Sequence, residues 1–122
     1  MFLLFRYLDG DISRVYNHGY FRDYALATQF RQYLSALYPD DGFRLFKVSY
    51  SQFSLEYPTY IFSVNRSLVR KWQTLGLFNS EDSADMFMSC MISFFPFSKY
   101  RIFNRFENAV QASHMDTQQA LF

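Results

Sequence analysis

The stretch RDYALATQFRQYLSALY, residues Arg22–Tyr38, indicates the fold class because it carries the clearest periodic pattern in the chain. Its Arg and Gln side chains fall mainly on one side of a helix, whereas its apolar side chains recur at helical spacing on the other: Leu26, Phe30, Tyr33, Leu34 and Leu37. Pro39 and the Asp-Asp-Gly that follows end the pattern with a turn. We therefore predict an amphipathic helix that packs its apolar face on a sheet.

A hairpin is predicted before this helix. Phe2–Leu8 is rich in strand-forming residues, and the following Asp-Gly pair is a hairpin-turn signal that returns the chain as Ile12–Asn17. The tripeptide Asn17-His18-Gly19 is then expected to end the second strand.

Two further strands are predicted after the helix. Phe43–Tyr50 alternates with a period of two residues, and Thr59–Val64 is a β-branched and aromatic run that pairs with it. The chain up to residue 64 is thus expected to contain two strands, a helix and two strands. We find no internal repeat in the sequence.

Residues 65–76 are predicted to form a short helix, capped by Asn65 or Ser67 and ended by Gly76. Its apolar positions are Leu68, Val69, Trp72 and Leu75.

A second helix is capped by Asn79 or Ser80 and stopped by Pro96. Its apolar positions are Ala84, Phe87, Met88, Met91, Phe94 and Phe95. Residues 99–106 fit either an edge strand or the start of a last helix, and residues 111–122 fit a frayed helix end or a tail. We predict one α+β domain over residues 1–122, with a small antiparallel sheet packed by helix 22–38 and a helical C-terminal half.

Aromatic residues are unusually frequent, with sixteen Phe, ten Tyr and one Trp among 122 residues. Each buried ring removes about 150–250 Å² from water, so we expect some rings to face solvent or a partner. The formal net charge of +1 gives no whole-molecule attraction to nucleic acid, although a local basic patch stays open.

Catalytic, metal-binding and nucleotide-binding signatures are absent from the sequence. Only His18 and His114 are candidate general bases near neutral pH, and neither has an evident partner in the sequence. The His and Cys residues are too few and irregularly spaced for a zinc site, and the isolated glycines build no phosphate-binding loop. We therefore expect no catalytic residue, no metal, no cofactor and no enzymatic activity.

The single cysteine, Cys90, is predicted to be a buried and unreactive thiol because Met88 and Met91 flank it at close range. A chain without an internal disulfide fits the reducing cytoplasm. The apolar run Phe2–Phe5 is too short for a signal sequence or a membrane span, so we expect a cytoplasmic protein with no membrane partner.

Two clusters of rings and cations are candidate partner-binding sites. In FSKYRIFNRF, residues 97–106, cations alternate with rings, and the candidate residues are Lys99, Tyr100, Arg101 and Arg105. The second cluster is Arg66, Arg70 and Trp72, in which the two Arg stand one helical turn apart. The alternatives are an edge strand with its rings in the core and a solvated helix face.

The sequence favours a non-enzymatic protein that binds a macromolecule. Arg beside half-exposed Tyr is typical of protein interfaces, which favours an accessory or inhibitory protein with a protein partner, of the kind common among phage- and plasmid-encoded proteins. The alternative is an accessory protein that binds single-stranded nucleic acid through residues 97–106. A homodimer is compatible with the sequence.

Overall fold

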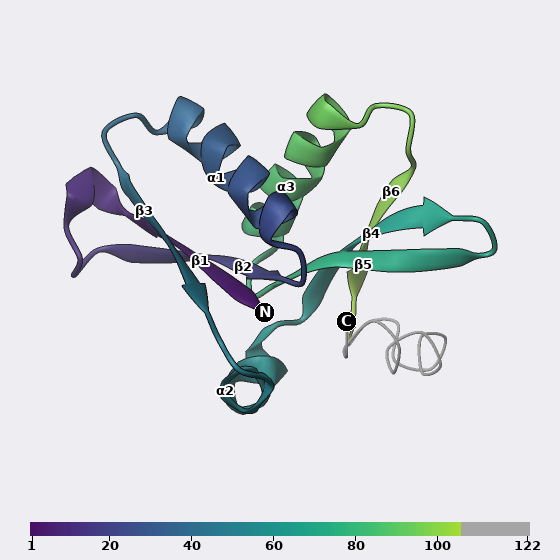
Figure 1. Cartoon of the computed structure of the whole chain (residues 1–122), viewed down its shortest axis with the longest axis horizontal. Coiled ribbons are helices and arrows are strands. Elements are labelled where there is room, and N and C mark those ends of the chain that lie inside the picture. Colours follow the sequence, from purple (N-terminus) through teal and green to yellow (C-terminus); the bar gives the residue numbers. More distant parts are fainter. Residues whose placement is uncertain (106–122) are drawn as a thin grey trace.

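The computed structural model describes residues 1–105 and contains a six-stranded antiparallel sheet in the order β3-β1-β2-β5-β4-β6 (Figure 1). Two helices, α1 and α3, lie on one face of the sheet, and the short helix α2 lies on the other (Figure 1). The strands are β1 (Phe2–Tyr7), β2 (Val15–Phe21), β3 (Gly42–Lys47), β4 (Phe62–Leu68), β5 (Lys71–Phe78) and β6 (Tyr100–Asn104). The helices are α1 (Tyr24–Leu37), α2 (Tyr50–Glu56) and α3 (Glu81–Phe94), with 3₁₀ turns at Leu8–Gly10 and Tyr57–Thr59.

The sheet consists of two copies of one ββαβ unit, which corrects our expectation that the chain has no internal repeat. The first unit is β1, β2, α1 and β3, and the second is β4, β5, α3 and β6. In each unit the third strand pairs with the first, so β3 and β6 form the two edges and β2 meets β5 at the centre. Tyr20 lies opposite Leu77 and Phe21 opposite Gly76 in this central antiparallel pair. An approximate twofold axis between β2 and β5 therefore relates the two units.

Equivalent residues of the two units stand at one constant separation in the sequence, from β2 to β3 and from β5 to β6. Helices α1 and α3 are both 14 residues long. Several equivalent positions carry the same residue, and most of these positions lie in the core or the bends: Gly19 and Gly76, Phe21 and Phe78, Ala27 and Ala84, Phe30 and Phe87, Pro39 and Pro96, Arg44 and Arg101, and Phe46 and Phe103.

Both hairpins carry a β-bulge at the same place, beside Gly19 in one unit and beside Gly76 in the other. Gly19 has φ +115°, and a Cβ there would come within 2.5 Å of the Phe78 ring. Asn17, His18 and Gly19 therefore lie inside β2, and our expectation that they end the strand is wrong. The glycine is required by the bulge and not by a turn.

The main core lies between the sheet and helices α1 and α3. At its centre four rings, Phe21, Phe30, Phe78 and Phe87, are fully buried, and every pair among them has a centroid distance between 5.1 and 6.5 Å. Edge-to-face packing of this kind stabilises aromatic clusters beyond their area burial. Two of the rings come from each unit, so this cluster joins the repeats.

A smaller core lies under α2 on the other face. Phe53 of α2 packs edge-on against Tyr20, with ring centroids 4.7 Å apart, and the Tyr60 ring contacts both, with centroids 4.6 Å from Tyr20 and 6.1 Å from Phe53. The Tyr20 hydroxyl donates a hydrogen bond to Glu56 at 3.0 Å. Helix α2 begins with a capping box formed by Ser49 and Gln52. The predicted strand Phe43–Tyr50 therefore ends earlier than expected, at Lys47.

The predicted α+β class is confirmed, as are the helix over residues 22–38 and the helix capped by Ser80, whose side chain accepts a hydrogen bond from the Ser83 amide. The predicted short helix within residues 65–76 is wrong, because these residues belong to the β4–β5 hairpin, with Arg70 at φ +64° in its turn. The C-terminal half is accordingly mixed. Of the two alternatives for residues 99–106, the structure contains the edge strand, β6.

The predictions for residues 111–122 and for His114 lie outside the described residues. Within residues 1–105, no helix is long and apolar enough to cross a membrane.

Candidate functional site

Most of the predicted partner-binding residues come together at one end of the second unit, where the β4–β5 hairpin turns and the α3–β6 loop passes beside it. Arg66 lies opposite Tyr100 and Asn65 opposite Arg101 in the β4–β6 ladder. The Ser67 amide donates a hydrogen bond of 2.8 Å to the Lys99 carbonyl, which ties the loop to the hairpin. We call this surface the basic end and define its cations as Arg66, Arg70, Lys71, Lys99 and Arg101.

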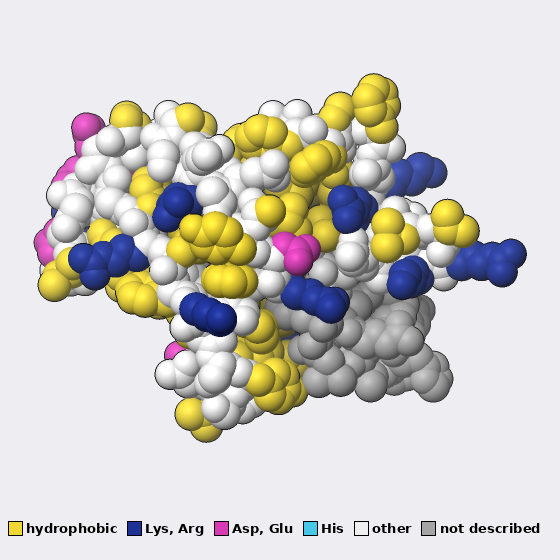
Figure 2. All heavy atoms as spheres, in the orientation of Figure 1, with side chains coloured by type: hydrophobic (Ala, Val, Ile, Leu, Met, Phe, Trp, Pro, Cys, Tyr) yellow, Lys and Arg dark blue, Asp and Glu magenta, His cyan; other side chains and the backbone are white. Residues whose placement is uncertain are grey.

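The basic end has no nearby negative charge in its own segments. Residues 65–73 and 97–103 contain no Asp or Glu. The two ion pairs found within residues 1–105, Arg6–Asp41 and Arg14–Asp9, both lie in the first unit. Arg66 donates instead to the Gln73 side-chain oxygen at 2.7 Å. Figure 2 shows basic side chains interleaved with apolar ones at the hairpin end of the molecule.

Large apolar side chains are exposed beside these cations. Phe97 in the α3–β6 loop is 100% exposed and Val69 in the hairpin turn is 89% exposed. Leu68 and Phe95 are each about one-third exposed. Exposed apolar groups of this size, rimmed by charge, are typical of interaction surfaces.

Trp72 and Arg101 lie on the face of the sheet opposite α1 and α3. The Trp72 ring packs edge-on against Phe103 at 5.9 Å, and the Arg101 guanidinium lies over the same Phe103 ring at 4.7 Å. Phe103 is only 5% exposed, so its ring is part of this packing and not a free stacking platform.

The structure separates two predicted residues from the others. The Tyr100 side chain turns toward α3, where its hydroxyl donates to the backbone carbonyls of Met91 and Phe95 at 3.3 and 3.0 Å. Arg105 follows the far end of β6, where it donates to the Tyr60 carbonyl and lies over the Tyr57 ring. The predicted Tyr100 phenol is thus used within the fold.

No family model, curated protein or solved structure matches this chain. The function is therefore argued from the site itself.

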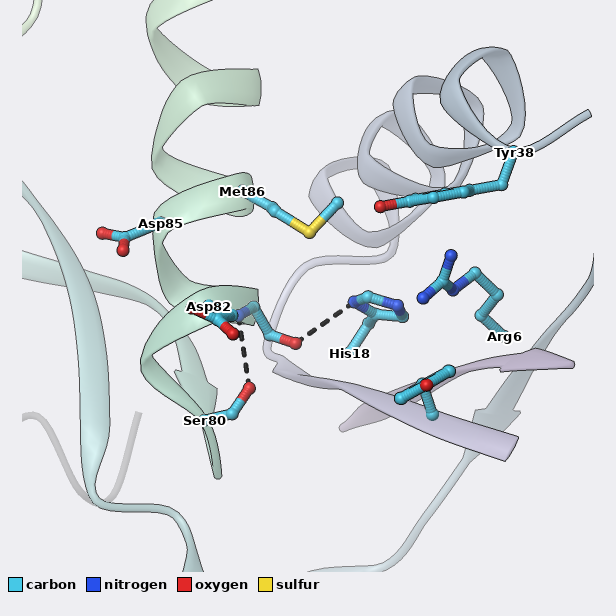
Figure 3. A pocket seen from close by; sticks show the side chains of 9 residues that line it. Arg6, His18, Tyr38, Ser80, Asp82, Asp85 and Met86 are labelled. Carbon is cyan, nitrogen blue, oxygen red and sulfur yellow. Dashed lines mark hydrogen bonds between the residues drawn. The ribbon is translucent and has the colours of Figure 1, made fainter. Parts of the chain in front are cut away.

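A second feature is a cavity of about 610 Å³ between the first unit and the start of α3 (Figure 3). Its lining comprises Arg6, Tyr16, His18, Tyr38, Ser80, Asp82, Ser83, Asp85 and Met86. The Arg6 guanidinium lies over the rings of Tyr38 and Tyr16, at 3.8 and 4.7 Å, and Arg6 forms an ion pair with Asp41 at 3.3 Å. Cation–π contact and the ion pair together fix Arg6 in place.

His18 was expected where the second strand ends, but it is a buried residue inside β2. Its Nδ1 lies 3.2 Å from the Ser83 hydroxyl oxygen, and its Nε2 has no partner within residues 1–105. Burial, together with the nearby Arg6 cation, lowers the pKa of His18 to about 4. Figure 3 shows the ring between Arg6 and the first turn of α3.

This arrangement does not suit general-base catalysis. A histidine with a pKa of about 4 accepts a proton poorly at neutral pH, and the Arg6 cation opposes the imidazolium that would form. Within residues 1–105, no three His, Cys, Asp or Glu side chains are placed to hold a metal ion. The cavity therefore offers neither an activated serine nor a metal centre.

Sequence reasoning missed two prominent residues of the basic end. Val69 was predicted as one of the apolar positions of a short helix, and Phe97 was not singled out within its stretch. The internal repeat is the signal that identifies Phe97, because Phe97 is equivalent to the exposed Asp40 and both follow the proline that ends a helix.

Proposed function

We propose that this chain is a non-enzymatic accessory or inhibitory protein that binds a partner protein through the basic end. The observation that carries the proposal is the combination, at one end, of cations that form no ion pair within residues 1–105 and two almost fully exposed apolar side chains, Phe97 and Val69. Arg and aromatic residues are enriched where protein interfaces gain most of their free energy.

The cavity beside His18 supports a binding role over an enzymatic one. Its histidine is neutral at physiological pH and contacts Ser83, and its Arg6 is engaged by Asp41 and by the rings of Tyr16 and Tyr38. Binding proteins need no such group, whereas the common acid–base and nucleophilic mechanisms do.

Single-stranded nucleic acid is the second candidate partner, because the acid-free run of cations suits a phosphate backbone. Stacking platforms are scarce, however. Among the rings of residues 97–105, the described part of the predicted stretch, only Phe97 is fully exposed, whereas Phe103 is buried and Tyr100 is partly buried. The protein partner is therefore our preferred candidate.

A capture experiment tests the proposal. Immobilised wild type is compared with a triple variant of the basic end, Arg70→Ser, Lys99→Ser and Arg101→Ser, and with a matched triple variant elsewhere, Arg14→Ser, Arg22→Ser and Arg31→Ser. We expect the wild type and the matched variant to retain the same protein from a host extract, and the basic-end variant to lose it. Retention of only nucleic acid, eluted by moderate salt and lost in the basic-end variant, would favour the second candidate.

A further inference from the structure

The internal repeat supplies a comparison for the basic end within the same molecule. The equivalent end of the first unit contains the β1–β2 loop and the α1–β3 loop, and it carries Asp9, Asp11, Asp40 and Asp41. We call it the acidic end. Pro39-Asp40-Asp41 at the acidic end corresponds to Pro96-Phe97-Ser98 at the basic end. Two ends with equivalent backbones, related by the approximate twofold axis, thus carry side chains of predominantly opposite charge.

The carboxylates of the acidic end are largely used within it. Asp41 accepts hydrogen bonds from the Asp9 amide at 2.9 Å and from the Arg6 guanidinium at 3.3 Å. Asp9 forms an ion pair with Arg14 at 3.8 Å. Asp11 accepts from the Ser13 amide and hydroxyl at 2.9 and 2.8 Å. These contacts engage three of the four carboxylates, and two of the three are paired with an arginine.

The basic end lacks the equivalent of the Arg6–Asp41 ion pair. Ser98 stands where Asp41 stands in the first unit, so Arg66, the equivalent of Arg6, has no carboxylate there and bonds to Gln73. Phe97 replaces an exposed Asp with a fully exposed ring. Neither change is needed by the fold, because the other unit builds the same bend without it.

Resting on the proposed function, we infer that the basic end holds one acidic protein segment that also presents apolar side chains, with Phe97 as the anchoring residue and a stoichiometry of one to one. Complementary charge selects this partner, since five cations whose own segments, residues 65–73 and 97–103, contain no Asp or Glu favour carboxylates on the opposing surface. Apolar contacts to Phe97 and Val69 then supply the part of the affinity that salt does not screen.

A second copy of this chain fits the surface less well. The acidic end would be the complementary face, but three of its four carboxylates, those of Asp41, Asp9 and Asp11, are engaged by Arg6, Arg14 and Ser13 respectively. Pairing between the edge strands is opposed as well, because β3 and β6 carry exposed Arg44 and Arg101 at equivalent positions.

The test uses defined probes and the full chain. A labelled peptide of alternating Glu and Leu is titrated with the protein at physiological salt, and its binding is compared with that of Lys-Leu and Glu-Ser peptides. A mixed-sequence single-stranded oligonucleotide and vesicles of phosphatidylserine and phosphatidylcholine are measured alongside. We expect one Glu-Leu peptide per protein, bound at least about tenfold more tightly than either comparison peptide.

The two variants are exchanges between the equivalent ends. Phe97→Asp introduces the residue that the first unit carries, so it is compatible with the bend, and it should weaken binding of the Glu-Leu peptide by about tenfold or more. The reciprocal control, Asp40→Phe, should leave binding unchanged. Thermal unfolding of both variants near the wild-type midpoint confirms that any loss of binding is local.

Failure of this inference is distinguishable from failure of the proposed function. No binding of the Glu-Leu peptide, equal binding of the Lys-Leu or Glu-Ser peptide, or unchanged binding by Phe97→Asp overturns the acidic docking site. A protein captured equally by wild type, Phe97→Asp and the basic-end variant leaves protein binding standing at another surface. Tightest binding of the oligonucleotide or of the vesicles, with no protein captured from extract, overturns both.

Discussion

At the scale of single residues, His18 links the packing of the two units to pH. It occupies the position that Leu75 occupies in the second unit, so the fold accepts an apolar side chain at that place. The first unit instead buries a neutral imidazole against Ser83 and beside Arg6. A proton on this ring would be desolvated and would lie next to another cation.

We predict that His18 makes the free energy of unfolding depend on pH between about 6.5 and 4. The folded pKa of about 4 lies below the ordinary value of 6.5, so in this window the unfolded chain binds a proton that the native state does not. Stability attributable to His18 is thus complete above pH 6.5 and is lost as the pH falls, by at most about 1.4 kcal/mol per unit.

Denaturant melts of wild type and His18→Leu across this range test the prediction. The variant loses the contact with Ser83, so the slopes with pH are compared and not the absolute stabilities. His18→Leu should flatten the slope, whereas the control His114→Gln should leave that component in place. Parallel slopes for wild type and His18→Leu would contradict the assignment.

Cys90 gives a second prediction at this scale. The thiol is fully buried in the main core, and burial raises its pKa to about 12. A thiolate is therefore disfavoured, and a thiol reagent should label the native protein far more slowly than the denatured chain. Labelling at equal rates under native and denaturing conditions would show that the α3 face is open.

At the scale of elements, the bulge at Gly19 is the most demanding local structure. Substitution by Ala forces a Cβ to within 2.5 Å of the Phe78 ring and 2.9 Å of the Leu77 carbonyl, on a backbone with positive φ. We expect Gly19→Ala to destabilise the protein by more than about 1 kcal/mol.

Gly42→Ala is the matched control, because the added Cβ meets its nearest atom at 3.6 Å, which is ordinary contact, and no positive φ is involved. Urea denaturation should rank the two variants clearly. A Gly42→Ala variant less stable than Gly19→Ala would show that the bulge is not constrained as described.

Elements with a local signal were predictable from sequence, and elements set by distant partners were not. Helix α1 has its whole apolar face within one continuous stretch, and α3 has a Ser80 cap and a stopping proline. The β4–β5 hairpin was mistaken for a helix because Leu68 and Trp72 stand four residues apart, a spacing that fits either structure. Pairing with β2 and β6 decides for strands, and those partners lie far away in the sequence.

At the scale of the whole molecule, the candidate site was also predictable only in part, because local sequence shows its residue types and distant strand pairing decides which of them meet. The cations and Trp72 were recognisable by type, but the two clusters become one surface only through the β4–β6 ladder. The repeat is hard to recognise in the sequence because most of the identical positions are the few that the packing needs, such as Phe30 and Phe87, while most of the exposed positions differ.

The repeat also raises the question of whether the two units unfold separately. Their strands share only the short β2–β5 ladder, but the four rings of the main core, two from each unit, pack against one another between the units. Phe30 of the first unit lies 6.5 Å from Phe78 and 5.2 Å from Phe87, both of the second unit. Unfolding of either unit would expose these rings to water, so we expect a single cooperative transition.

Phe30→Ala tests this cooperativity, with Trp72, the one tryptophan of the chain, as a reporter in the second unit. The cavity left by the ring should lower the free energy of unfolding by about 3–5 kcal/mol, and both units should be destabilised to the same extent. Fluorescence of Trp72 and far-UV circular dichroism should therefore shift to the same lower urea midpoint. A Trp72 transition that stays at the wild-type midpoint while the circular dichroism signal splits into two steps would mean that the units fold independently. The ring cluster would then not be what joins them.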